Sequence, residues 1–185
     1  MPRCSRITIA GVPLHLIQRG NNRQACFYSR ADYHAYLEWL QENAQRYSCA
    51  IHAYALTTNH VHLLITPRTS GGAGDLMKQL GQHYVQYVNH TYSRSGTLWE
   101  GRFRSCLAWE EEYVLGCYRC IKLNPVRAKI IEHSAEYQWS SCRANAQSEH
   151  SVLLTQHRLY TALGKDDEVR LTASVSYSAT NLTRK

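Results

Sequence analysis

The stretch AIHAYALTTNHVHLLIT constrains the fold more than any other part of the chain. Its two apolar runs, residues 50–56 and 60–66, have strand length and are separated by a short TTN turn. Two strands joined so closely pair as an antiparallel hairpin. The remaining elements therefore have to be arranged around a hairpin in the first half of the chain.

The segments around the hairpin predict an α+β fold. Ser29 is a good helix N-cap, and Asp32 three residues later gives an approximate capping box. The predicted elements are strand 6–19 with a turn at Gly11–Pro13, helix 29–47, the hairpin, helix 75–92, strand 105–109, helix 110–124 ended by Pro125, and short helical pieces at 137–145 and 153–164. The first six match a ferredoxin-like split βαβ core, an antiparallel sheet with helices on one face, followed by a C-terminal helical extension.

We expect one domain over residues 1–132, an extension of the same domain over 133–164, and a disordered Ser/Thr-rich tail over 165–185. Hydrophobic residues make up 44% of the 185, enough for a core. The seven cysteines form no regular framework, and neither a signal peptide nor a membrane span is recognisable. These features predict a cytoplasmic protein with free thiols and no membrane partner.

The positive charge is concentrated in one part of the chain. Lys and Arg number 21 against 14 Asp and Glu, a net charge of +7. Residues 1–105 hold 11 basic and 5 acidic side chains, a difference of +6, which leaves +1 for 106–185. This asymmetry indicates either a surface that binds a polyanion or a surface that is merely basic and well hydrated.

The hairpin carries a pair of histidines. Because alternate side chains of a strand share a face, Val61, Leu63 and Ile65 are expected to enter the core. His60 and His62 then lie together on the opposite face, where they can bind one small ion. The alternative is a pair of histidines at the core edge, each bonded to backbone or water.

A third ligand is available on the helix over residues 110–124. Asn124 follows Cys120 by four positions, so the two side chains lie on one helical face. An amide oxygen with two imidazoles leaves positions for water and a phosphate oxygen, which suits Mg²⁺ or Mn²⁺. Alternatively, Asn124 only caps the helix before proline.

Four ordered stretches resemble the REP-associated tyrosine transposases, single-strand DNA transposases of the His-hydrophobic-His (HUH) superfamily. They are AIHAYALTTNHVHLLITP, GTLWEGRFRS, EEYVLGCYRCIKLNPVRA and YQWSSCRAN, and the similarity covers about residues 5–164. The resemblance implies that His60, His62 and Asn124 hold a divalent metal that polarises a phosphate of single-stranded DNA. It also implies a 5′-phosphotyrosine intermediate, rejoining by a 3′-OH, a palindromic hairpin substrate, a monomer (with a homodimer as alternative) and a location at the nucleoid.

The chain departs from that family at the nucleophile. The family pattern resembles RYIELNPVRA, and here Cys120 stands at its tyrosine and Lys122 at its acidic position. Tyr118 faces about 200° away around the helix, and Tyr113 lies roughly 10 Å back along its axis. A cysteine side chain is several ångströms too short, so we expect weak strand cleavage and rejoining, or a DNA-binding protein without cleavage.

The cysteines allow two further readings. Cys117 and Cys120 form a CxxC motif, but a redox pair is expected at a helix N-terminus rather than in the middle of a helix. A zinc site made by Cys120, His60 and His62 is also conceivable.

Several arginines and two aromatic residues are candidates for contact with DNA. Arginine neutralises phosphates, and aromatic rings can stack on unpaired bases. Trp99 and Phe103 could instead belong to the core, with only the arginines exposed. The predicted DNA-binding residues are Arg19, Arg23, Arg94, Trp99, Arg102, Phe103, Arg104, Arg119 and Arg127.

Overall fold

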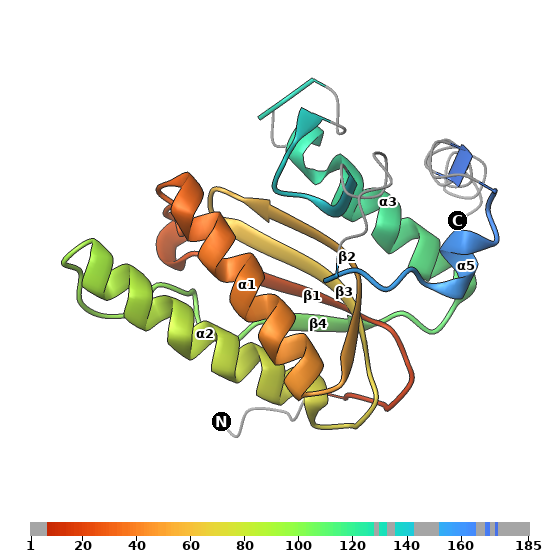
Figure 1. The fold of residues 1–185 in the computed structure, drawn as a ribbon, viewed down its shortest axis with the longest axis horizontal. Coiled ribbons are helices and arrows are strands. Elements are labelled where there is room, and N and C mark those ends of the chain that lie inside the picture. The colour runs from red at the N-terminus through yellow and green to blue at the C-terminus, as the bar shows by residue number, and fades with distance from the viewer. Residues whose placement is uncertain are drawn as a thin grey trace.

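Four strands form one antiparallel sheet in the order β2-β3-β1-β4 (Figure 1). The computed structural model describes residues 7–127, 130–132, 136–142, 152–165, 169–170 and 173. The elements are β1 Leu14–Arg19, η1 Asn21–Arg23, α1 Arg30–Arg46, β2 Cys49–Thr57, β3 His60–Pro67, α2 Gly72–Thr91, β4 Arg104–Leu107, α3 Glu111–Arg127 and α5 Arg158–Thr161. The order of strands and helices confirms the predicted α+β, ferredoxin-like arrangement.

Helices α1 and α2 cover one face of the sheet and build the main core with it (Figure 1). The predicted capping box is present, because Asp32 accepts a hydrogen bond of 2.8 Å from the backbone N–H of Ser29. Tyr36 of α1 and Tyr84 of α2 are fully buried against each other, with ring centroids 5.0 Å apart. Val61, Leu63 and Ile65 of β3 enter this core, as the alternation predicts.

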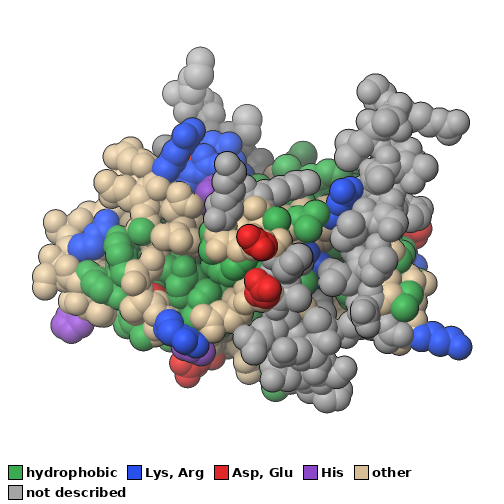
Figure 2. Space-filling model, turned by 90° about the horizontal axis from the view of Figure 1, so that it is seen from above, with side chains coloured by type: hydrophobic (Ala, Val, Ile, Leu, Met, Phe, Trp, Pro, Cys, Tyr) green, Lys and Arg blue, Asp and Glu red, His purple; other side chains and the backbone are tan. Residues whose placement is uncertain are grey.

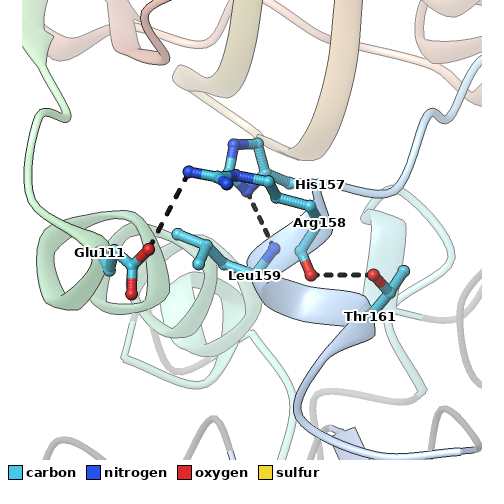
Figure 3. Close-up of polar contacts among 5 residues, drawn as sticks. All are labelled: Glu111, His157, Arg158, Leu159 and Thr161. Atoms are coloured by element: carbon cyan, nitrogen blue, oxygen red, sulfur yellow. Dashed lines mark hydrogen bonds and ion pairs between the residues drawn. The ribbon is translucent and has the colours of Figure 1, made fainter.

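Helix α3 and the short α5 cover the opposite face, where a second apolar cluster includes Ala53, Leu64 and Tyr118. Figure 3 shows how α5 begins beside the first turn of α3. His157 caps α5 by accepting a hydrogen bond from the Leu159 N–H, and Arg158 lies 4.0 Å from Glu111. This ion pair is exposed and contributes little, so apolar packing holds α5 in place.

The predicted end of α3 and the predicted start of β1 are wrong. Helix α3 does not end at Pro125 but continues to Arg127, since a proline in the last turn removes only one helical hydrogen bond. Strand β1 begins at Leu14 rather than at residue 6, because the turn at Gly11 precedes the sheet.

Of the helix predicted over residues 153–164, only α5 forms. The segment before it is extended and lies along β2, with the Thr155 N–H donating to the Ile51 carbonyl at 2.8 Å. Strand β2 is at the edge of the sheet, where backbone groups are available for such pairing. The helix predicted over 137–145 lies partly outside the described residues, and the tail predicted over 165–185 lies almost entirely outside them.

Candidate metal and nucleic-acid site

Strand β3 places His60 and His62 on the face of the sheet that α3 covers. Leu63 points the other way, into the core under α1 and α2. His62 is buried and His60 half-buried, with their ring centroids 5.9 Å apart. The pair therefore lies between the sheet and α3, as the alternation of the strand predicts.

His62 has polar partners on both ring nitrogens. Its Nε2 lies 3.1 Å from the amide Nδ2 of Asn124 on α3, and its Nδ1 lies 3.3 Å from Nε2 of His15 on β1. The structure thus brings together the predicted residues His62 and Asn124. Sequence reasoning missed His15, although Leu14 and Leu16 in the core place it on the same face of the sheet.

The imidazoles of this site are held in the neutral form. Burial lowers the pKa of His62 to about 3, helped by the neighbouring His15, His60 and Arg19. Burial also lowers the pKa of His15, and burial together with Arg19 and Arg23 lowers that of His60. A neutral imidazole has a lone pair to offer, so the site is ready for a cation at neutral pH.

The geometry fits a small cation with oxygen and nitrogen ligands. Two ligands at about 2.1 Å and at right angles around one cation lie about 3 Å apart, and His62 Nε2 and the Asn124 amide are separated by 3.1 Å. Rotating the side-chain amide of Asn124 by 180° exchanges its nitrogen and oxygen, so that the oxygen faces His62. With His15 accepting the Nδ1 proton of His62, the lone pair of that ring is on Nε2, toward Asn124.

His60 is oriented in a similar way by Thr57. The Thr57 hydroxyl donates to the His60 carbonyl at 3.3 Å and lies 3.2 Å from His60 Nδ1. The Nδ1–H then donates to that hydroxyl, which leaves the Nε2 lone pair for a ligand. Both histidines of the pair therefore present Nε2.

The closed zinc site is contradicted. No three His, Cys, Asp or Glu side chains in the described part of the chain converge closely enough to hold a metal, so Cys120, His60 and His62 do not form one. Burial, together with the neighbouring Cys120 and Cys106, raises the pKa of Cys117 to about 12, opposite to the shift that a reactive CxxC thiol needs. The six described cysteines form no disulfide.

Cys120 is half-buried on α3, one turn before Asn124. The two nearest tyrosines of α3 lie in different surroundings. Tyr118 is fully buried, stacks on Tyr160 with centroids 4.7 Å apart, and accepts a hydrogen bond of 3.1 Å from the His157 N–H. Tyr113 is partly exposed, and burial with the thiols of Cys117 and Cys106 raises its pKa to about 12. Neither tyrosine replaces the one that the family pattern leads us to expect.

Lys122, the second departure from the family pattern, is part of the packing between α3 and α5. Its side chain is 1% exposed, its Nζ donates to the Tyr160 hydroxyl at 2.6 Å, and it lies 4.1 Å from the centroid of that ring. The lysine therefore faces α5, and its charge is stabilised by an aromatic face and a hydroxyl.

Three of the predicted arginines gather next to the histidine pair. Arg19, Arg102 and Arg104 line a pocket of about 140 Å³, which we call the arginine pocket. Arg19 is the cross-strand partner of His60, so the arginine pocket and the site are neighbours. Figure 2 shows a face of the molecule on which Lys and Arg side chains lie around an area of exposed apolar side chains.

The other predicted DNA-binding residues lie in different surroundings. Arg94 donates to the Tyr28 hydroxyl at 2.9 Å, and Arg119 Nε is buried without a partner among the described residues. Trp99 is buried in the core and Phe103 packs against it, so Trp99 is no exposed stacking surface. Arg23 is the last residue of η1 and contributes to the lowered pKa of His60, whereas the side chain of Arg127 lies outside the described residues.

Within the described residues, no helix is long and apolar enough to cross a bilayer.

No curated protein matches the chain. Two solved structures are similar to it. The REP-associated tyrosine transposase bound to a REP hairpin superposes with a TM-score of 0.63 at 15% identity, covering 85% of this chain and 93% of that one. A putative transposase from Deinococcus radiodurans R1 gives 0.45 at 17% identity, covering 70% and 92%.

The first likeness supports the fold alone, because the identity is so low, and the second is too distant to carry an argument. A sequence match is more specific. The family model described as "Transposase IS200 like" matches residues 8–128, more than half of the chain and including both histidines, Cys120 and Asn124. The chain therefore belongs to the IS200-like transposase family.

Proposed function

We propose that this chain binds single-stranded or hairpin DNA and holds one backbone phosphate at His60, His62 and Asn124 with Mg²⁺ or Mn²⁺. The observation that carries the proposal is the 3.1 Å approach of the Asn124 amide to His62 Nε2, beside an arginine pocket. A divalent cation bound there would draw charge from a phosphate oxygen and ease cleavage of the P–O bond.

The chain's own residues have distinct tasks. His62 and Asn124 bind the cation, and His15 keeps the His62 lone pair on Nε2. Arg19, next to His60, neutralises a neighbouring phosphate. The similar fold of a transposase solved with a REP hairpin makes a hairpin with a short single-stranded extension the natural probe.

Strand cleavage and rejoining need a nucleophile, and Cys120 stands at the position of the family's tyrosine. Its thiol is several ångströms shorter in reach than a phenol hydroxyl. We therefore propose that the wild-type chain cleaves DNA weakly and that the rest of the site is intact.

A second candidate is a DNA-binding protein without cleavage on the same fold, acting on repetitive palindromes. Two observations favour it. Cys120 replaces the nucleophile, and Lys122 replaces an acidic residue and is buried against Tyr160.

Restoring the tyrosine separates the two candidates. The Cys120→Tyr variant is incubated with an end-labelled hairpin DNA and Mn²⁺, and covalent protein–DNA adducts are resolved on a denaturing gel. We expect an adduct and a product with a free 3′-OH from this variant and little from the wild type. The same change at the exposed Cys106 of β4 is the matched control and should give no adduct.

Adding His62→Ala to Cys120→Tyr should remove the adduct. Hairpin binding by both variants is measured in parallel and shows that they are folded. Tight binding by Cys120→Tyr without any adduct would contradict the cleavage proposal and favour the binding protein. Absence of salt-dependent hairpin binding by the wild type would contradict both.

A further inference from the structure

A second, larger cavity adjoins the arginine pocket. It is a groove of about 600 Å³ between α2 and residues 99–103, and it shares Gly101 and Arg102 with the arginine pocket. We call it the α2 groove. Its walls are mostly apolar and include Met77, Val85 and Phe103. The proposed phosphate site uses none of these three residues.

Two buried polar atoms belong to residues that line the α2 groove. The Oε1 of Gln18 and the Nε1–H of Trp99 have no hydrogen-bond partner among the described residues. Both side chains are almost completely buried, Gln18 being 7% exposed and Trp99 6% exposed. An unsatisfied acceptor and an unsatisfied donor at one place favour a ligand that carries both groups on one edge.

Gly81 leaves room for that edge. Gly81 lies within α2, where a glycine makes the helix less stable than an alanine would. A glycine at this position therefore indicates a constraint other than helix stability. A Cβ at this position would lie 3.8 Å from Gln18 Nε2 and 3.9 Å from Trp99 Nε1. Alanine would therefore just fit, whereas a larger side chain would occupy the space in front of both polar groups.

The surroundings of the α2 groove are mainly cationic. Lys78 and Arg102 are exposed and line it. Arg19 and Arg104 lie in the adjoining arginine pocket, where these arginines outnumber the one carboxylate in its lining, that of Glu100. Gly101, shared by both cavities, has φ +114°, a conformation that other residues rarely adopt. An occupant of the two cavities therefore combines a flat apolar part, a donor and an acceptor on its edge, and a negative charge beside it.

We propose that the α2 groove binds one unpaired nucleobase of the DNA, with the phosphate of the same nucleotide in the arginine pocket. The base packs against Phe103 and Met77, and its polar edge meets Gln18 and Trp99. This proposal rests on the proposed DNA binding and adds a site that reads a base rather than the backbone. An occupant with apolar groups alone would leave the two polar atoms unpaired.

The first test removes single bases from the probe. A hairpin with a short single-stranded extension and loop is made with one abasic nucleotide at each unpaired position in turn, and affinity is measured by fluorescence anisotropy. At one or two positions we expect a loss of roughly 10- to 100-fold, the usual range for a base held by stacking. Losses below twofold at every unpaired position, with tight binding of the intact hairpin, would overturn the proposal.

The second test fills the α2 groove. Gly81→Leu should lower affinity for the intact hairpin by the same factor as the sensitive abasic position, and the abasic change should then cost nothing further. Gly81→Ala should lower affinity less than Gly81→Leu, because its Cβ would stand beside Gln18 and Trp99 at ordinary contact distance. His90→Leu, an exposed change on the same helix and outside the groove, is the matched control and should have no effect.

The outcomes separate this proposal from the proposed function. Hairpin binding that is insensitive both to abasic changes and to Gly81→Leu overturns the base site and leaves DNA binding intact. Dimerisation that Gly81→Leu abolishes, without an abasic effect, would assign the groove to a second copy instead. Failure of the wild type to bind any hairpin overturns both proposals.

Discussion

The two faces of the sheet are filled by different chemistry. Under α1 and α2 the contacts are mostly apolar and aromatic, with Tyr36, Leu63 and Tyr84 fully buried, although Gln18 and Asp32 are buried there too. Under α3 and α5 the sheet buries polar groups, among them His62 and Lys122. Burying a polar group costs free energy unless it is hydrogen-bonded, so such groups have a purpose or a partner. The first face stabilises the fold, and the second carries the candidate site.

The largest effect is expected from the apolar face. Leu63→Ala removes a fully buried side chain from the core under α1 and α2. The free energy of unfolding, measured by urea titration, should fall by about 2 to 5 kcal/mol. The folded fraction of this variant should still bind hairpin DNA. A fall below about 1 kcal/mol would mean that this face is not the main source of stability.

Acid should act on the opposite face. His52 is buried there, with its Nδ1–H donating to the Thr155 carbonyl at 2.6 Å and its Nε2 accepting from the Thr66 hydroxyl at 2.7 Å. Burial lowers its pKa from the ordinary value of 6.5 to about 4. As the pH falls below 6.5, His52 becomes protonated in the unfolded chain but stays neutral in the folded chain. The free energy of unfolding therefore decreases until the pH reaches about 4.

The shift corresponds to a loss of up to about 3 kcal/mol from this histidine. Urea titrations at several pH values between 7 and 4 measure it. His52→Gln should remove its part of the pH dependence and leave the part that comes from His62, whose pKa is also lowered, whereas His90→Gln, at an exposed position, should not change it. Leu63→Ala should lower stability equally at every pH. Identical slopes for His52→Gln and the wild type would show that acid acts elsewhere.

Removal of the metal separates the faces by function. Chelation of divalent cations should weaken hairpin binding by the wild type by roughly 10-fold, because the cation connects the phosphate to His62 and Asn124. His62→Ala should bind weakly with or without chelator, and Leu63→Ala should respond like the wild type. Filter binding in EDTA and in Mn²⁺ measures the three proteins. An equal response of His62→Ala and wild type would contradict the assigned ligand.

The smallest effect concerns the arginine pocket at the edge of the second face. Arg19→Ala should reduce the slope of log affinity against log salt by about 0.7, the contribution of one phosphate contact on a single strand. Arg68 lines a different cavity, together with Gln41 and Ser48. Arg68→Ala is therefore the matched control and should leave the slope unchanged. Equal slopes for Arg19→Ala and the wild type would remove Arg19 from the DNA contact.

Much of the fold was predictable because local patterns agree with it. The alternation of Val61, Leu63 and Ile65 determines which face of β3 enters the core, and the Ser29 capping box determines where α1 begins. The ends of elements were less predictable. Pro125 lies in the last turn of α3, where a proline is tolerated, and local sequence does not reveal this position.

The candidate site was predictable only in part. The spacing of His60 and His62 and the position of Asn124 indicated three of its residues. His15 comes from a neighbouring strand, and its contact with His62 depends on a strand register that the sequence of β1 does not reveal. Trp99 resembled an exposed stacking residue because aromatic and basic residues alternate there, but its burial depends on packing against Tyr84.

The most direct test of the second face is binding of Mn²⁺ to the protein without DNA. Isothermal titration should give one Mn²⁺ per chain, and electron spin-echo modulation should show histidine nitrogen bound to it. His62→Ala and Asn124→Leu should each weaken this binding strongly, while Leu63→Ala should keep it. Histidine-bound Mn²⁺ in the wild type that persists unchanged in both ligand variants, or no Mn²⁺ binding at all, would contradict the proposed site.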